Sequence, residues 1–581
     1  MGRSLRVVHD LATDAVTAQP IPDRGAPMSS QPRHVEPQRR SQRVDVVVLG
    51  TGAAGLAAAV TAASYGASVA LVEKGDKVGG TSAWSGGMVW IPNNPHMRSK
   101  GIADNVDDAR RYLTSMSHGM IEDSLAESFL VNGPEVIRWL EANTPVQFTI
   151  VDGMPDYHPE HPGGCVTGGR SLECDLYPFG ELGEWAERVT VGAQNAKPYF
   201  RMSETPIGSP IPVRLDPGEL ARRKAGNLRG VGQSLVGRLL RGCLDRGLVP
   251  VTSTAGRRLI VEDGTVVGVT VEGPDGELDI RASGGVVLAT GGFEWDSQFV
   301  RSFLRGPLTR TVSLPTNTGD GLRMSMRIGA ALANMREAWW VPIADVENEE
   351  GDTYAYLIQA DRTKPHSIMV NGAGRRFTNE AANYNSAGAA FHVMDAHTFE
   401  YANLPAYMIF DAEFLRRYGF AKHAPGDAGY EWLTSADTIA GLAAKIGVPS
   451  DALEETVDLW NKHCIDLVDP DFHRGSSAHD NWWGDPAYKG TPAATLGPVD
   501  SAPYYAIEVH AGALGTRGGP RTGPDGEVLD VDGEVIPGLY AAGNVMASPL
   551  GMTYGGGGGT LACGLVFGHL AGRHAAQRAA G

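Results

Sequence analysis

Near the start of the chain, a run of apolar residues leads directly into three closely spaced glycines, and few folds accommodate this arrangement. Residues 44–49 (Val-Asp-Val-Val-Val-Leu) predict a strand buried on both faces, and residues 50–55 (Gly-Thr-Gly-Ala-Ala-Gly) follow without a break. An alanine-rich helix is expected next, then a second strand over 68–72 with Glu73 at its end. Strand, glycines, helix, strand and acid in this order predict a βαβ unit that binds a dinucleotide.

A different structural requirement explains the glycine at each of these three positions. Gly50 permits a tight turn, Gly52 lets the backbone approach a pyrophosphate, and Gly55 lets the helix pack closely on the strand. The N–H groups at the start of the helix, at Ala53 and Ala54, are donors for phosphate oxygens. These five residues are therefore predicted to bind the cofactor.

The acidic residue after the second strand distinguishes between dinucleotides. Glu73 is placed to accept a hydrogen bond from a ribose hydroxyl, and a carboxylate there disfavours the 2′-phosphate of NADP. The neighbouring Lys74 is included in the predicted cofactor site.

Two further segments extend the cofactor domain toward the C-terminus. Residues 284–293 predict a buried strand that ends in Thr-Gly-Gly, and residues 536–544 predict another near the chain end. The stretch between them is richer in aromatic residues, His, Asn and Pro, which indicates an inserted domain. We therefore predict an α/β fold, in which a Rossmann-like cofactor domain holds an inserted α+β substrate domain. The predicted boundaries are 44–337 with 511–581 for the cofactor domain and 338–510 for the substrate domain.

The N-terminal segment has a different composition from the rest. Residues 1–43 carry seven arginines and five prolines, but no apolar stretch long enough for a secretory signal. We expect a disordered tail. Met28 offers a second start, so whether residues 1–27 belong to the native protein is left open.

Composition narrows the possible partners. Glycine accounts for 75 of 581 residues without a collagen-like period, so the excess is expected in tight turns and loops that contact a ligand. The net charge of −17 opposes binding to nucleic acid. The five cysteines form no CxxC pair, which favours a reducing cytoplasm over a disulfide framework.

Metal and membrane sites are not expected. His158 and His161 have a passable spacing for a metal but no third ligand nearby. The apolar segment 44–72 is interrupted by glycines and consists mostly of alanine, so no membrane span is predicted.

Several segments together resemble the fumarate reductase/succinate dehydrogenase flavoprotein superfamily. Besides the first glycines and Glu73, the resemblance rests on 79–87 (Gly-Gly-Thr-Ser-Ala-Trp-Ser-Gly-Gly), 289–292 (Ala-Thr-Gly-Gly), 317–321 (Asn-Thr-Gly-Asp-Gly) and 538–544 (Gly-Leu-Tyr-Ala-Ala-Gly-Asn). It implies that the cofactor is FAD and that the 79–87 loop lies against the flavin. Because residues 76–87 contain no His, the covalent tether of succinate dehydrogenases is missing and non-covalent FAD is predicted.

The same resemblance adds further residues to the predicted FAD site. They are Gly80, Thr81, Ser82, Gly86, Gly87, Met88, Ala289, Thr290, Gly291, Asp320, Gly543 and Asn544.

The segment after the last cofactor strand differs from that of the fumarate enzymes. In those proteins an Arg in this segment binds a carboxylate of the substrate, whereas residues 552–559 here read Met-Thr-Tyr-Gly-Gly-Gly-Gly-Gly. A buried dianion without that cation is costly. A dicarboxylate reductase is therefore disfavoured.

This segment instead resembles the 3-ketosteroid Δ1-dehydrogenases, whose Thr-Tyr-Pro-Gly-Ala-Gly motif holds the substrate ketone. Further matches to that family are 156–164 (Asp-Tyr-His-Pro-Glu-His-Pro-Gly-Gly), 337–342 (Glu-Ala-Trp-Trp-Val-Pro), 368–370, 374–380 and 514–519 (Leu-Gly-Thr-Arg-Gly-Gly). Nearly the whole chain after residue 43 is covered. The chain departs from the pattern at Ala382-Asn383, where a small residue and Pro are common, and at Gly555, which replaces Pro and is expected to make the loop more flexible.

The resemblance implies roles for four residues. Tyr554 and the N–H of Gly558 would bind the ketone oxygen, and Tyr384 would remove the α proton. A phenol is a poor base at neutral pH unless a hydrogen bond or a positive field lowers its pKa. Tyr157 is expected to supply that hydrogen bond.

These roles predict FAD-dependent 1,2-desaturation of a 3-ketosteroid. Two donors polarise the ketone, the α proton leaves, and a hydride passes from the β carbon to flavin N5. The expected partners are an apolar ketone and an unidentified electron acceptor. The alternatives are a desaturase of a smaller cyclic ketone of the cyclohexanone type, a Δ4-(5α)-ketosteroid dehydrogenase, and a flavin protein without turnover, which the three tyrosines disfavour. The ring system and the oligomeric state stay open.

Overall fold

A seven-stranded sheet carries the N-terminal βαβ unit at one edge. Its order is β2 (Val69–Val72), β1 (Arg40–Leu49), β10 (Gly276–Leu288), β21 (Val535–Ala541) and β20 (Glu527–Leu529), with β9 (Thr265–Gly273) and β8 (Ala255–Glu262) added through β10. The strands β2, β1, β10 and β21 are parallel. Both ends of the chain therefore contribute to one sheet, as the sequence predicts.

The computed structural model describes residues 40–192, 198–209, 215–347, 351–421 and 423–581. β1 begins at Arg40, and its first residues pair with β10, from Arg40 with Leu278 to Arg43 with Arg281. The predicted tail over 1–43 is thus four residues too long, because this backbone finds partners in the sheet. The rest of that tail lies outside the described residues.

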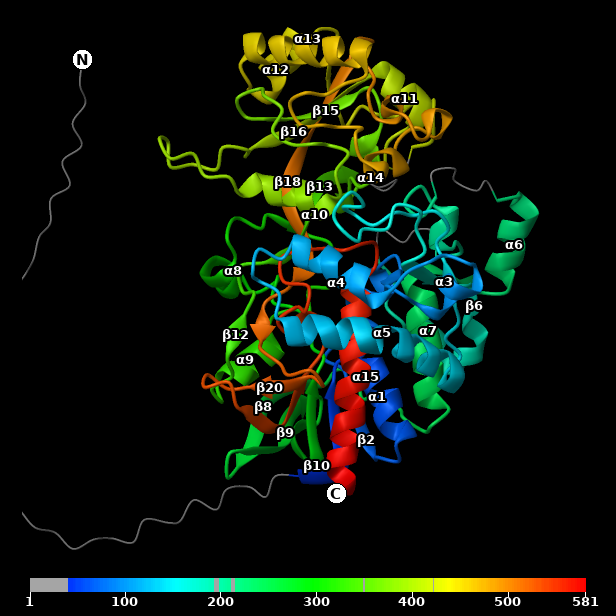
Figure 1. The fold of residues 1–581 in the computed structure, drawn as a ribbon, viewed down its shortest axis with the longest axis vertical. Helices are drawn as coiled ribbons and strands as arrows, with labels where there is room; N and C mark the ends of the chain where they lie inside the picture. The colour runs from blue at the N-terminus through cyan, green and yellow to red at the C-terminus, as the bar shows by residue number, and fades with distance from the viewer. Residues whose placement is uncertain (1–39, 193–197, 210–214, 348–350, 422) are drawn as a thin grey trace, which may run out of the picture. The chain divides into compact units, whose positions relative to one another are not determined.

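Two helices cover the sheet beside the first glycines. They are α1 (Ala53–Ser64) and the C-terminal α15 (Gly559–Ala580), which lie side by side in Figure 1. A Cβ at Gly568 or Gly572 would lie 2.3 Å from the carbonyl oxygen of Ala54 or Ala58, respectively. Glycine on α15 therefore brings the two helix backbones together.

A second seven-stranded sheet is mostly antiparallel. Its order is β14 (Thr353–Leu357), β13 (Ala338–Glu347), β18 (Tyr504–Thr516), β16 (Ala406–Asp411) and β15 (Ser367–Asn371), with β11 (Arg310–Thr311) and β17 (Thr434–Ala436) paired to β18. The helices α12 (Ile439–Ile446) and α13 (Ser450–Asp466) pack on it.

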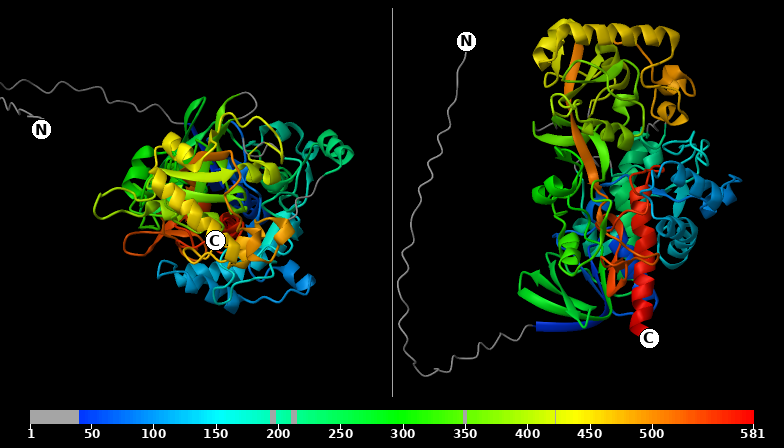
Figure 2. Two further views of the ribbon diagram at one scale, coloured as in Figure 1. Left: turned by 90° about the horizontal axis from the view of Figure 1, so that it is seen from above. Right: turned by 60° about the vertical axis from the view of Figure 1, so that its left-hand side comes forward.

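The long strand β18 crosses the predicted boundary at 510/511. It continues to Thr516 and runs toward the start of α15, as Figure 2 shows in orange and red. β11, from the predicted cofactor domain, pairs with β18 in parallel. Residues 40–581 pack as one unit, so the division into two domains stays a prediction.

The remaining helices and strands connect and flank these two sheets. They are α2 (Gly80–Trp84), β3 (Val89–Trp90), α3 (Pro95–Ser99), α4 (Val106–Ser115), α5 (Asp123–Asn143), β4 (Phe148–Ile150), β5 (Ser171–Cys174), β6 (Tyr177–Pro178), α6 (Pro217–Ala225), β7 (Leu228–Arg229), α7 (Val231–Leu244), α8 (Ser297–Phe303), α9 (Asp320–Met326), β12 (Leu332–Ala333), α10 (Tyr384–Ala389), α11 (Ala412–Tyr418), α14 (Ala478–Trp482) and β19 (Gly519–Pro520). None of the described helices has both the length and the apolar character that crossing a membrane requires.

Candidate active site

The first glycines form a turn against a second predicted cofactor segment. Gly50 has a φ of +107°, and a Cβ there would lie 2.2 Å from the carbonyl oxygen of Ala289. Gly52 is the N-cap of α1, and the first turn of that helix contains no acidic side chain. Ser82 Oγ accepts a hydrogen bond of 3.0 Å from the N–H of Ala53. This turn joins three of the predicted cofactor segments at one helix N-terminus.

The carboxylate of Glu73 ties the first glycine loop to the end of β2. One oxygen accepts from the N–H and the hydroxyl of Thr51 at 2.9 and 2.6 Å, and the other accepts from Gly75 N–H at 2.8 Å. Lys74 forms an ion pair of 2.8 Å with Asp320 and donates to Thr318 Oγ1 at 2.6 Å. The two predicted cofactor residues Lys74 and Asp320 therefore meet.

The C-terminal cofactor segment reaches the same helix start. A Cβ at Gly543 would lie 3.1 Å from Ala54 Cβ. Asn544 Oδ1 accepts a hydrogen bond of 3.0 Å from the indole of Trp339. Thr290 Oγ1 is buried and has no partner among the described residues.

The glycine-rich 79–87 loop packs closely against other segments of the chain. A Cβ at Gly86 would lie 2.2 Å from Met202 Cε, and one at Gly87 would lie 2.4 Å from the backbone of Val231. These contacts alone account for the two glycines, so their expected approach to a flavin stays a prediction. The following Met88 packs against the glycine at the start of α15, which links this loop to the tyrosines described next.

Tyr157, Tyr384 and Tyr554 come together from three distant parts of the chain. The Tyr384 hydroxyl donates to the Tyr554 hydroxyl at 2.9 Å. The ring centroids lie 5.0 to 5.5 Å apart, and each pair meets edge to face. All three side chains are at most 5% exposed. The sequence therefore selects three residues that form one buried cluster.

Tyr384 is held by the helix it begins. The side chain of Asn383 caps α10 by accepting from Ser386 N–H at 3.1 Å. A Cβ at Gly388 would lie 2.5 Å from the N atom of Val341, so α10 sits directly on β13. Asn383 thus performs, as an N-cap, a positioning task at the place where the family commonly has Pro.

Tyr157 is held by a buried ion pair and by the Tyr554 loop. The neighbouring Asp156 pairs with Arg170 at 2.7 Å and accepts from the indole of Trp90 at 2.8 Å. The N–H of Tyr157 donates to the carbonyl of Gly555 at 2.9 Å. The backbones that carry Tyr157 and Tyr554 are therefore bonded to each other.

Close packing explains the glycine run after Tyr554. A Cβ at Gly555 would lie 2.5 Å from the ring of Trp90, which occupies the space that a proline ring would need. The carbonyl of Gly555 also accepts from the hydroxyl of Tyr112 at 2.8 Å. Gly558 has a φ of +104°, and a Cβ there would lie 2.4 Å from the backbone of Met88. The replacement of Pro by Gly555 is expected to make this loop flexible, but two hydrogen bonds to the carbonyl of Gly555 hold the loop in place.

The electrostatics of the cluster differ from the expectation. Burial raises the pKa of Tyr384 well above its ordinary value, and Tyr157 and Tyr554 raise it further. Burial and the charge of Tyr554 raise the pKa of Tyr157 well above its ordinary value. The hydrogen bond with Tyr384 and the charge of Arg362 act in the opposite direction but do not cancel this rise. Burial also raises the pKa of Tyr554, against hydrogen bonds and the charge of Arg517. The expectation that Tyr157 lowers the pKa of Tyr384 is wrong for this arrangement.

Aromatic and cationic residues complete the cluster. Trp483 stacks on Tyr384 with ring centroids 6.4 Å apart, and His479 meets Tyr157 at 5.1 Å. Trp339 lies 4.6 Å from Tyr554. Arg517 is placed at the Tyr554 loop by its bonds to that backbone. The sequence predicted no role for Arg517, although it stands in the quoted 514–519 match.

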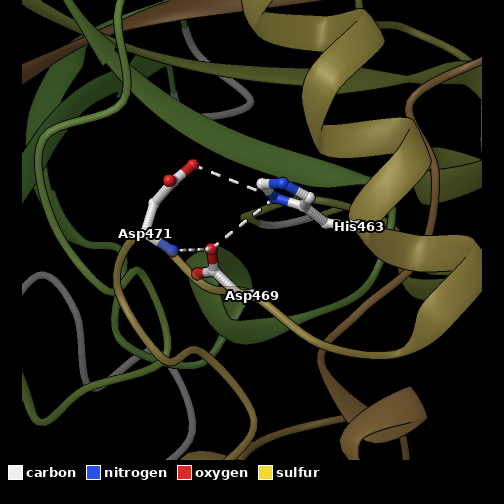
Figure 3. A group of neighbouring side chains, drawn as sticks. All are labelled: His463, Asp469 and Asp471. Carbon is white, nitrogen blue, oxygen red and sulfur yellow. Dashed lines mark hydrogen bonds and ion pairs between the residues drawn. The ribbon is translucent and has the colours of Figure 1, made fainter.

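The structure also contains a group of possible metal ligands away from the tyrosines. His463, Asp469 and Asp471 place ligand atoms within 4.8 Å of one another (Figure 3). Asp469 already binds Arg376 at 2.9 Å, and its oxygens accept from the N–H groups of Asp471 and Arg474. Its lone pairs are thus engaged in holding this loop.

Comparison with known proteins identifies the class. The family described as FAD binding domain matches residues 45–561. The chain belongs to this family, and FAD is its cofactor. The helix start without acidic residues, the glycine turn and the Thr290 hydroxyl, which has no hydrogen-bond partner in the described part of the chain, fit such a dinucleotide. The predicted α/β flavoprotein fold is confirmed.

Its similarity to individual proteins is more specific. The 4-oxocyclohexanecarboxylate 2-dehydrogenase of Sinomonas cyclohexanicum is 41% identical over 545 residues, which cover 92% of this chain and 93% of the relative. The 3-oxosteroid 1-dehydrogenase of Mycobacterium tuberculosis is 39% identical over 569 residues, 93% of this chain and 99% of the relative.

A solved structure agrees with these relatives. The 3-ketosteroid Δ1-dehydrogenase of Sterolibacterium denitrificans, in complex with 1,4-androstadiene-3,17-dione, superimposes with a TM-score of 0.85 at 34% identity, covering 92% of this chain and 99% of the other. The predicted resemblance to this branch of the superfamily is confirmed, and the chain is an FAD-dependent oxidoreductase that acts on CH–CH groups.

Proposed function

We propose that this chain desaturates the C1–C2 bond of a 3-ketosteroid. The observation that carries the proposal is the contact between the hydroxyls of Tyr384 and Tyr554 in a buried, aromatic-lined cluster. A ketone needs a donor at its oxygen and a base near its α carbon, and two adjacent phenols from different elements can supply both.

Each residue then has one task. Tyr554 and the N–H of Gly558 donate to the ketone oxygen, which makes the α proton more acidic. Tyr384 receives that proton, and Tyr157 holds Tyr384 from the side. FAD, when bound, supplies the acceptor for the hydride that leaves the β carbon. Because burial disfavours the phenolate of Tyr384, we expect turnover to rise with pH as the tyrosine cluster loses a proton.

The alternative substrate is a smaller cyclic ketone. Its support is the 41% identity to an enzyme named for 4-oxocyclohexanecarboxylate, against 39% for one named for 3-oxosteroids. Both substrates carry a ring ketone, so the tasks of the tyrosines are the same for either. The apolar neighbours Trp339 and Trp483 favour the steroid.

We also propose that the enzyme works in the cytoplasm with FAD held non-covalently and an electron acceptor not yet identified. All five cysteines are free, which suits a reducing compartment.

Anaerobic titration of the purified flavoprotein tests the function. Androst-4-ene-3,17-dione, 4-oxocyclohexanecarboxylate and succinate are added separately, and bleaching of the oxidised flavin band is followed. We expect bleaching by the steroid at the lowest concentration and none by succinate. Bleaching by the keto acid alone would favour the alternative, and the absence of bleaching by either ketone would reject ketone desaturation.

A further inference from the structure

The guanidinium of Arg517 joins the backbone of the Tyr554 loop to the helix of Tyr384. Its Nη1 donates to the carbonyl oxygens of Thr553 and Gly551 at 2.6 and 3.2 Å. Its Nη2 donates to Asn385 Oδ1 at 2.7 Å, and Asn385 follows Tyr384 in α10. One rigid side chain therefore fixes both phenols relative to each other.

This guanidinium forms no direct ion pair with a carboxylate among the described residues. The carboxylate whose charge acts on it, that of Glu337, pairs instead with Arg305 at 3.3 Å. Arg517 is 1% exposed, and its Nε is buried without a hydrogen bond there. The three acceptors it uses are neutral, and the ring of Trp339 lies 3.7 Å below it. An unpaired buried cation is costly, so a site that retains one must gain from it elsewhere.

The phenol of Tyr554, the proposed ketone donor, is one of the groups on which this charge acts. The guanidinium carbon lies 5.5 Å from the centroid of the Tyr554 ring. Both Nη groups are occupied by protein acceptors, so Arg517 is not arranged to bind a substrate carboxylate in the bidentate manner. The positive charge of Arg517 instead stabilises negative charge on the oxygen that the Tyr554 hydroxyl binds.

We infer that Arg517 is a positioning residue that locks the Tyr554 loop to α10 and, through its unpaired charge, favours an anionic oxygen at Tyr554. This inference rests on the proposed function, because that oxygen is the enolate formed when the α proton leaves. A site that bound the ketone oxygen with a phenol and a backbone N–H alone would lack this positive charge.

A coloured phenol tests the charge without turnover. The flavoprotein is titrated with 4-nitrophenol over a range of pH, and the visible absorbance of the bound nitrophenolate gives the pKa of the bound ligand. Tyr554→Phe should weaken binding, which locates the ligand. Arg517→Met should raise the bound pKa by roughly one to two pH units, the effect of a unit charge at this range and an effective dielectric constant of about 20. Arg517→Lys should keep it near the wild-type value.

The positioning role is tested by flavin reduction with saturating ketone. Arg517→Lys keeps the charge but reaches fewer of the three acceptors, so the maximal rate should fall about tenfold or more while KM changes little. Asn385→Leu, which removes the acceptor on α10 and leaves the guanidinium in place, should show the same loss of rate. If Arg517→Met does not fold, Arg517→Gln replaces it as the uncharged variant, with the same expected rise of the bound pKa.

Three results would overturn the inference. They are a wild-type protein that does not bind nitrophenolate, an Arg517→Met protein whose bound ligand keeps the wild-type pKa, and an Arg517→Lys or Asn385→Leu protein that reduces flavin at the wild-type rate. The proposed function can fail separately. If the nitrophenol results are as expected but no ketone reduces the flavin, the proposed function is rejected and the effect of the Arg517 charge at Tyr554 still holds.

Discussion

The hydroxyl of Tyr384 donates a hydrogen bond of 2.9 Å to that of Tyr554, although the two residues are 170 positions apart in the chain. In the proposed mechanism, a ketone oxygen bound by Tyr554 has its α carbon close to Tyr384. The pair would then supply a proton donor for the oxygen and a proton acceptor for the carbon, a division of roles that substitution of either tyrosine tests.

Tyr384→Phe should reduce turnover severely and leave the FAD content unchanged. The substitution removes the proposed proton acceptor, while the ring still packs against Trp483. Steady-state rates and the ratio of flavin to protein absorbance measure the two effects. A variant that loses FAD in proportion to its activity would show that Tyr384 supports the fold instead.

FAD should be released by acid or heat. Residues 76–87 contain no His, so the covalent tether that the resemblance would place there is missing. After precipitation of the protein, all flavin should appear in the supernatant. Flavin that stays with the washed pellet would contradict non-covalent binding.

The βαβ unit around the first glycines could be predicted from the sequence because the residues that determine its structure lie close together in the chain. The strand, the glycines of 50–55 and Glu73 lie within one βαβ unit, where short-range periodicity and turn chemistry determine the structure. Even the two chain ends were placed correctly in one sheet, since each carries a buried strand followed by glycine.

The substrate side depends on contacts that periodicity does not show. The three tyrosines were found only through the resemblance, because nothing near Tyr157 or Tyr384 in sequence marks a meeting with Tyr554. Arg517 was missed for the same reason, since its partners lie on a different loop and a different helix. The pKa relation between Tyr157 and Tyr384 was also mistaken, because burial and hydrogen-bond direction are properties of the folded site.

Gly555→Ala should destabilise the protein by about 1 to 3 kcal/mol, the usual cost of overpacking. Its Cβ would lie 2.5 Å from the ring of Trp90, which is fully buried. Gly180→Ala is a matched control, because a Cβ there meets nothing within 4 Å. Thermal unfolding of both variants is compared. Equal melting temperatures would show that Trp90 does not restrict residue 555.

Stability should fall as the pH drops below the ordinary range of histidine. Burial lowers the pKa of His158, His392 and His569 from 6.5 to about 4. The unfolded chain therefore binds more protons than the folded one between these values, so the free energy of unfolding rises with pH there. Each histidine contributes a slope of up to about 1.4 kcal/mol per pH unit.

His392→Gln tests that explanation. The variant should lose less stability than the wild type between about pH 7 and about pH 5, because one proton fewer is taken up on unfolding. Denaturant titrations at the two pH values give the comparison. An unchanged difference would mean that His392 is already protonated in the folded protein or is not buried as described.

The most direct test of ketone polarisation is deuterium exchange at the α carbon, measured with hydride transfer in Tyr554→Phe. The variant loses one of two donors to the developing oxyanion, so exchange and flavin reduction should both slow by about 10²- to 10³-fold. Tyr384→Phe, measured alongside, should lose exchange as well. Tyr554→Phe that exchanges the α proton and reduces flavin at wild-type rates would contradict the proposed mechanism, and the likeness to steroid dehydrogenases would then be one of fold alone.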